Sequence, residues 1–162
     1  MATFEKDFIL RQIRQLVQLI ARIVLRAHAE GQYASGLEEV RATMEGYLGF
    51  DYEMLGRIDP ASAALLVHDG EALRTLAWIA AQEGELLEGA GDPAAAQDQR
   101  RPALALYAEC AKRYPGEAAA CLEAARALAA ETETGQLAKK YRRWLEPQLP
   151  ARDRTGPGSL LD

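Results

Sequence analysis

Four acidic residues lie close together in the middle of the chain, at Glu83, Glu85, Glu88 and Asp92. Neighbouring carboxylates can serve as a general acid and a general base when two of them share one face of a helix. At 100° per residue these four spread over a wide arc, and some border the apolar stripe of their segment. A solvated helix face is therefore the better interpretation, and we predict no acid–base pair here.

The histidines and serines form no recognisable catalytic or metal-binding pattern. His28 and His68 belong to neither an H-x-x-x-H pair nor an E-x-x-H motif, the spacings that bring metal ligands onto one helix face. No serine lies in a G-x-S-x-G context, and no glycine precedes a lysine as in a Walker-type loop. We expect no metal, no cofactor and no catalysis, with an enzyme lacking a local motif as a minor alternative. His28 is expected to cap a helix end, and His68 to lie in a turn.

Two cysteines are too few for a disulfide framework. Cys110 and Cys121 flank Pro115, so an antiparallel hairpin would bring them nearly level. Buried apolar packing is the favoured role, because neither position shows a cation that would activate a thiol. Glu5 and Asp7 stand where a secretory signal carries positive charge, which together with the cysteine usage predicts a cytoplasmic protein.

A basic run, Lys139-Lys140-Tyr141-Arg142-Arg143-Trp144, could stack on nucleic-acid bases. Tyr141 and Trp144 share a stripe with Leu137 and Leu145, which makes them core and leaves the cations on the outer face near a helix C-terminus. The formal charge of −5 is also unevenly spread. Residues 31–99 carry three basic and 13 acidic groups, so an accumulated positive field is lacking. We do not expect nucleic-acid binding.

The composition predicts an all-α protein. The chain has 162 residues, 49% of them hydrophobic and 27% charged, with many alanines and few β-branched residues after the first 25 positions. No uncharged apolar stretch approaches the length of a bilayer span, so no membrane partner is expected. We predict a single domain over residues 1–150, of about six or seven helices in antiparallel hairpins, followed by a disordered tail at 151–162.

The first predicted helix, residues 4–29, is unusually apolar. One stripe runs through Ile9, Ile13, Leu16, Ile20, Ile23 and Ala27. Further apolar residues widen this arc to about 200°, twice what a surface helix needs for a single core contact. The apolar surface beyond that single contact must be covered by an irregular insertion near residues 49–70 or by a second copy of the chain. We predict a homodimer through this helix, formed by Phe8, Ile9, Leu16 and Leu19.

Turn and cap residues divide the rest of the chain. Gly31 ends the first helix, and a second one follows over residues 37–48. Asp59-Pro60 opens a short helix in the otherwise irregular insertion, and Gly91-Asp92-Pro93 separates helices at 71–89 and 94–114. Pro102 should kink or split the latter. Two more helices are predicted, over 117–130 and 136–145.

These hairpins resemble the tetratricopeptide repeat, whose helices cross at small residues and turn at glycine. Small and large residues match that pattern at Gly84, Leu87, Gly91, Ala96, Ala103 and Leu104, and part of it recurs at Gly31, Gly36, Val40 and Met44. A weaker copy runs through Ala125, Leu128, Tyr141 and Leu145. Arg100 departs from it, because a large apolar residue is usual there. The opening FEKDFILRQIRQLVQLIARI also resembles a small bacterial family of unknown function.

The resemblance implies an interaction module with a right-handed array and a concave groove. That groove would be lined by Gln18, Ala21, Leu25, His28, Trp78, Ala81, Glu85, Glu88, Ala119, Leu122 and Arg126. Trp78 with Glu85 and Glu88 could hold a cationic side chain, which gives the alternative function, binding a basic peptide of another protein. Trp78 could instead pack under the insertion.

Overall fold

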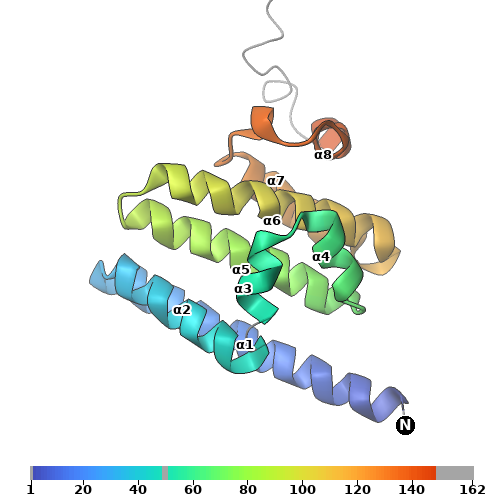
Figure 1. Cartoon of the computed structure of the whole chain (residues 1–162), viewed down its shortest axis with the longest axis horizontal. Helices are drawn as coiled ribbons and strands as arrows, with labels where there is room; N and C mark the ends of the chain where they lie inside the picture. The colour runs from blue at the N-terminus through green and yellow to red at the C-terminus, as the bar shows by residue number, and fades with distance from the viewer. Residues whose placement is uncertain (1, 49–50, 149–162) are drawn as a thin grey trace, which may run out of the picture.

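The computed structural model describes residues 2–48 and 51–148 (Figure 1). Over these residues the chain forms eight α-helices and no strand, which confirms the all-α prediction. The helices are α1 (Ala2–Glu30), α2 (Tyr33–Leu48), α3 (Asp51–Arg57), α4 (Pro60–Leu66), α5 (Gly70–Gly89), α6 (Pro93–Arg113), α7 (Ala118–Ala129) and α8 (Lys139–Leu145). Helix α3 was not expected. The predicted tail at 151–162 lies outside the described residues.

Aspartate caps and glycine turns set the helix boundaries. Asp59, Asp69 and Asp92 each accept a hydrogen bond from a backbone N–H three residues on, which satisfies a donor that the first helical turn leaves free. Gly31 and Gly91 have φ values of 66° and 88°, a left-handed conformation that glycine adopts without strain. Two of these caps and both glycine turns stand where the sequence predicted a boundary.

Helices α5 and α6 form the central layer, with α1 and α2 on one side and α7 and α8 on the other (Figure 1). The two central helices approach closely at Gly84. A β-carbon there would lie 3.2 Å from the Ala96 carbonyl oxygen and 2.9 Å from Cγ of Arg100. Ala96, Ala103 and Leu104 on α6 are buried as well.

Helix α6 runs unbroken through Pro102, so the predicted alternative of a split helix is wrong. The proline ring occupies the place of the amide that would bond the carbonyl of Asp98 one turn earlier. Asp98 and Pro102 both line the cleft that is described below. The helix continues because α5, α7 and α4 pack along it.

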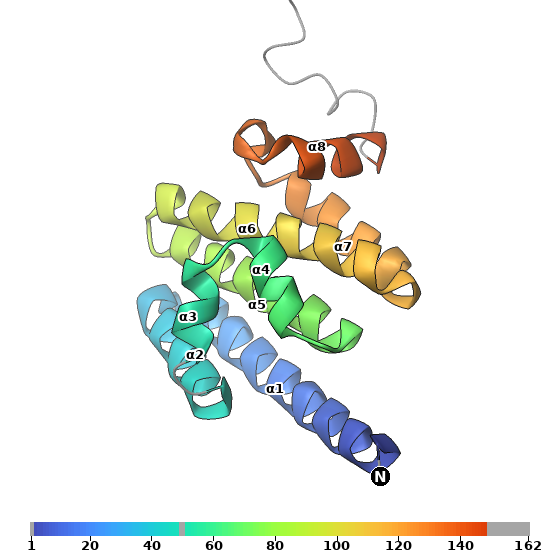
Figure 2. The same cartoon turned by 45° about the vertical axis from the view of Figure 1, so that its right-hand side comes forward.

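Helix α1 extends past its neighbours. Arg14 lies 3.5 Å from Glu71, and His28 lies 3.2 Å from Glu85, so α5 runs beside α1 with a constant offset and begins level with about residue 13. Helix α2 folds back along α1 but has 16 residues against 29. Figure 2 shows the N-terminal part of α1 projecting beyond both.

The hydrophobic core has two main clusters joined by α5. One lies between α1, α2 and α5, and there Leu16, Ile20, Ile23 and Ala27 are buried, as the predicted stripe requires. The other lies between α4, α5, α6 and α7 and continues toward α8. Trp78 packs against both clusters.

Candidate functional site

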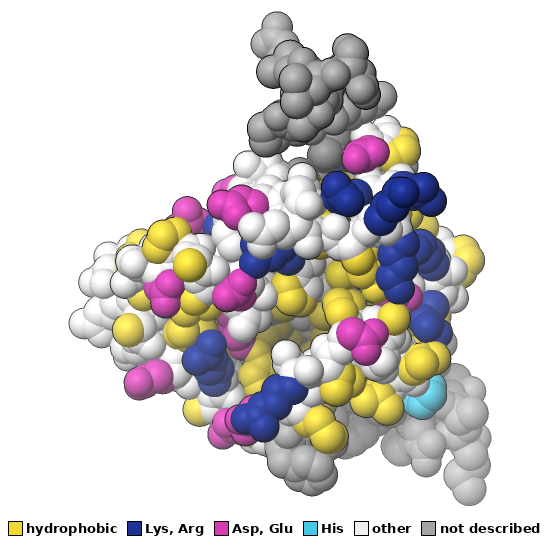
Figure 3. Space-filling model, turned by 45° about the horizontal axis from the view of Figure 1, so that its top comes forward, with side chains coloured by type: hydrophobic (Ala, Val, Ile, Leu, Met, Phe, Trp, Pro, Cys, Tyr) yellow, Lys and Arg dark blue, Asp and Glu magenta, His cyan; other side chains and the backbone are white. Residues whose placement is uncertain are grey.

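A cleft of about 520 Å³ opens between α2, α3, α4, α5 and α6. In space-filling form one face of the molecule is hollowed near its centre, with hydrophobic side chains inside and charged ones around it (Figure 3). The cleft is lined by Arg41, Glu45, Tyr52, Glu53, Leu55, Gly56, Arg57, Ile58, Pro60, Ala63, Leu76, Ala80, Glu83, Asp98, Gln99, Pro102 and Leu106. Nine of these 17 residues are apolar or glycine, and six are charged.

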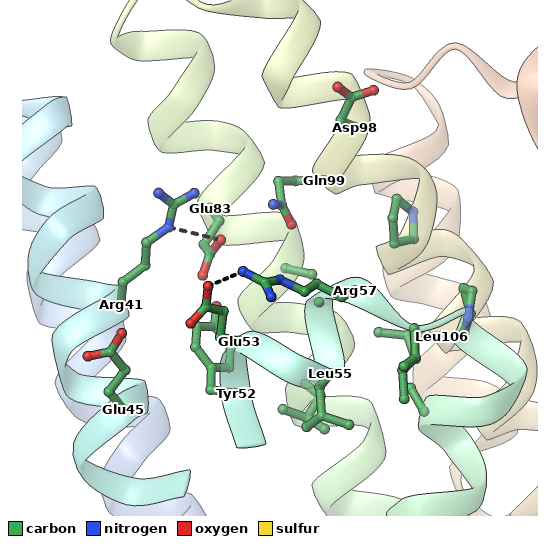
Figure 4. A pocket seen from close by; sticks show the side chains of 17 residues that line it. Arg41, Glu45, Tyr52, Glu53, Leu55, Arg57, Glu83, Asp98, Gln99 and Leu106 are labelled. Atoms are coloured by element: carbon green, nitrogen blue, oxygen red, sulfur yellow. Dashed lines mark hydrogen bonds and ion pairs between the residues drawn. The ribbon is translucent and has the colours of Figure 1, made fainter. Parts of the chain in front are cut away.

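Glu83 is the buried charge of this cleft. Its side chain is 4% exposed, and Oε2 lies 3.7 Å from Nε of Arg41, while Oε1 receives no hydrogen bond from any described residue. Figure 4 shows Glu83 pointing from α5 toward α3, with Arg41 approaching from α2. Burial raises the pKa of Glu83 to about 7, and the nearby Arg41 only partly offsets this.

The solvated face predicted for the acidic cluster is thus wrong at Glu83. Glu85 and Glu88 are about half exposed, and Asp92 caps α6. Glu83 differs because α5 is covered on several sides. The sequence does carry a signal, since Leu76, Ala80 and Glu83 follow one another at spacings of four and three and line the same cleft.

The other charged groups of the cleft are exposed and mostly paired with one another. Arg57 lies 2.5 Å from Glu53, one turn away on α3. Asp98 pairs with Arg101 at 2.6 Å, and Glu45 forms no ion pair with the described residues. Four acidic and two basic side chains line the cleft, so its charge balance favours a cation.

The cleft offers carboxylates, paired charges and an apolar surface. A carboxylate with a pKa near 7 can accept a proton, but nucleophilic catalysis also needs an activated hydroxyl, thiol or amine. No serine, cysteine, histidine or lysine is found among the described residues that line it. A buried carboxylate above an apolar floor is suited to holding a ligand cation.

The predicted groove residues are only partly brought together. His28 and Glu85 form the pair at 3.2 Å, and the His28 ring also meets Tyr33 edge-on instead of capping helix carbonyls. Glu88 points to the other side of α5, where it binds Arg100. Trp78 is half-buried between the two clusters, a core role that the sequence left open.

Of the remaining groove residues, Ala81 lies on α5 and the others lie on α1 and α7. Leu25 is 71% exposed, Leu122 is half-buried, and Arg126 is exposed. Of the residues predicted for self-association, Leu16 is buried within the single chain, whereas Leu19 is 40% exposed. The side chains of Phe8 and Ile9 lie outside the described part of the structure.

Arg100, the departure from the repeat pattern, is buried at 2% exposure. Its guanidinium binds the carboxylate of Glu88 and donates to the Glu131 carbonyl at 3.4 Å, while Nε has no partner. The side chain thus spans from α5 to the segment after α7. It fills the space of a large apolar residue and keeps its charge paired.

Both cysteines and Tyr141 of the basic helix are buried. Cys110 and Cys121 are both buried and free. A hydrogen bond with Cys121, followed by burial, raises the pKa of Cys110 above its usual value, so this thiol is not activated. Tyr141 is buried as predicted and donates to Glu109 at 2.8 Å. Lys140 lies 3.6 Å from Glu109, which compensates part of the basic run.

Within residues 2–48 and 51–148, no group of three or more His, Cys, Asp or Glu side chains is placed to hold a metal ion. None of the described helices has the length and apolarity needed to cross a bilayer. Comparison of the chain with protein-family models, with curated proteins and with solved structures found no match. The resemblances to the tetratricopeptide repeat and to a bacterial family therefore stay predictions.

Proposed function

We propose that this protein is a non-catalytic interaction module that self-associates through α1. The observation that carries the proposal is the projection of α1 beyond α2 and α5, together with the exposed Leu19. Leu19 lies level with both neighbouring helices and is 40% exposed, so they do not cover it completely.

A second copy of the chain is the occupant that fits this face. The insertion does not supply the cover, because α3 packs mainly against α2 and α4 against α6. A two-fold axis across α1 would place the projecting part of each helix beside that of the other copy, so each copy would supply the neighbour that the other lacks.

A tetratricopeptide-like arrangement of the hairpins belongs to the same proposal. It is supported by the close approach at Gly84 and by the glycine turns at Gly31 and Gly91. The basic-peptide groove is the weaker candidate, because Trp78 contributes to the core and both Glu85 and Glu88 already have internal partners.

Light scattering coupled to gel filtration tests the self-association. Over a wide range of protein concentrations we expect a dimer mass that falls toward the monomer on dilution. Leu19→Asp should give a monomer with an unchanged helical circular-dichroism spectrum, because the side chain is already partly in solvent. Leu16→Asp is unsuitable, since Leu16 belongs to the core of the single chain.

Leu65→Asp is the matched control. Leu65 is 59% exposed on α4, which packs against α6, so this variant should remain dimeric. A wild-type mass that stays monomeric at every concentration would falsify the proposal. A dimer that survives Leu19→Asp but dissociates with Leu65→Asp would move the interface away from α1.

A further inference from the structure

Glu83 is a charged side chain that the fold buries without a full set of partners. It is more than nine-tenths buried, Oε1 accepts no hydrogen bond from the described residues, and the nearest cation is 3.7 Å away. That distance exceeds a hydrogen bond, so Arg41 supplies charge and little more. A buried carboxylate normally accepts two or more hydrogen bonds, because leaving them unmade is costly.

The rest of the cleft is suited to an apolar group beside this carboxylate. Ala63, Leu76, Ala80 and Leu106 come from three different helices and line the same space. Tyr52 lines the same cleft and supplies an aromatic ring (Figure 4). The Glu83 carboxylate, the Tyr52 ring and the aliphatic side chains therefore line the same cleft.

We propose that this cleft binds a small organic ammonium ion, whose cation lies against Glu83 and whose apolar part packs on α4, α5 and α6. An ammonium group has three donors and can supply the hydrogen bonds that Glu83 lacks. The cleft volume of about 520 Å³ falls within the range of small-molecule sites, which favours a free ligand over a protein segment.

Arg41 is the internal competitor for this position. It is 48% exposed and forms no other ion pair or hydrogen bond with the described residues, so its side chain can move toward solvent. A ligand ammonium that replaces it keeps the carboxylate charge compensated. The inference is independent of the proposed dimer, because the cleft lies on α2 to α6 and Leu19 on α1.

Backbone amide NMR titrations of the full-length wild-type chain test the proposal with phenethylammonium as the probe. The neutral isostere 2-phenylethanol has the same ring and chain but no cation. We expect the ammonium to bind at least about tenfold more tightly than the alcohol, with the largest shifts at Tyr52, Leu76 and Ala80. Equal affinities, or shifts confined to other parts of the chain, overturn the proposal.

Glu83→Gln removes the charge while keeping the shape, and should abolish the preference for the ammonium over the alcohol. Glu85→Gln is the matched control, because it removes a carboxylate from the same helix outside the cleft. Retention of the preference in Glu83→Gln overturns the assignment. Nα-acetyl-lysine amide carries its ammonium on a peptide unit. Tighter binding of this probe, by about tenfold, would overturn the choice of a small ligand over a protein side chain.

Discussion

Replacing Glu83 by glutamine should make the protein more stable at neutral and alkaline pH. The pKa of this carboxyl rises from 4.5 to about 7 on folding. At about 1.4 kcal/mol per pKa unit, this corresponds to about 3 kcal/mol of unfolding free energy. The folded state holds the proton more tightly than the unfolded state, so stability falls as the pH rises from about 4.5 to 7 and stays reduced above that window.

The glutamine side chain is neutral throughout this pH range, so the stability of the variant does not fall for this reason. We expect the unfolding free energy of Glu83→Gln minus that of wild type to grow by about 2–3 kcal/mol between pH 5 and pH 8. Urea unfolding at a series of pH values, followed by far-ultraviolet circular dichroism and by the fluorescence of Trp78 and Trp144, measures this difference. The charged groups that line the cleft with Glu83, namely Arg41 and Glu45 from α2, Glu53 and Arg57 from α3 and Asp98 from α6, are otherwise unchanged in the variant.

Glu45→Gln is the control for this experiment, because Glu45 lines the same cleft but is exposed. The difference in unfolding free energy between Glu45→Gln and wild type should stay constant over the same pH series. If the curves of wild type and Glu83→Gln run parallel within about 1 kcal/mol, Glu83 is not desolvated in the folded chain, and the reasoning from its burial is refuted.

Three further predictions concern the packing around the central hairpin, each measured by urea unfolding. Gly84→Ala should lower the unfolding free energy by about 1–3 kcal/mol, because the new β-carbon meets the backbone of α6. Gly46→Ala has open space around it and should raise the unfolding free energy by about 0.5–1 kcal/mol. Equal effects of the two substitutions would contradict the close approach at Gly84. Arg100→Met should leave the unfolding free energy unchanged or raise it, whereas Arg100→Ala should lower it by about 2–4 kcal/mol. A large decrease in both variants would show that the ion pair itself stabilises the fold. Tyr141→Phe should lose about 1–2 kcal/mol because Glu109 loses a buried hydrogen bond, and an unchanged midpoint would contradict that.

The sequence predicts the helices well where one apolar stripe meets one core. The stripe of α1 appears in the structure as the buried side of that helix, and the boundaries at Asp59 and Gly91 follow from local capping and turn chemistry. Helix α3 is missed, because Asp51–Arg57 is too short for a helical period to show.

The site is harder to predict, because reading a helical wheel assumes that only one face of the helix is buried. Helix α5 packs against α1, α2, α6 and α7, so residues well off its stripe, such as Ile79 and Leu86, are buried along with it. Glu83 lies on that extended buried surface. Its burial depends on α2, which lies more than thirty residues earlier in the chain, and no local pattern reports that contact.

Arg100 and Glu83 show why burial alone does not identify a functional charge. Both lie on the central hairpin and both are nearly enclosed, but the Arg100 guanidinium is bound to a carboxylate and a carbonyl, whereas Glu83 has one cation beyond hydrogen-bond distance. A charge kept for packing is expected to be compensated, as Arg100 is. A carboxylate that is buried without a full set of hydrogen-bond partners, as Glu83 is, instead points to a role outside folding. If Glu83→Gln both raises the unfolding free energy at pH 8 and removes the preference for an ammonium ligand, the same missing partner explains both results.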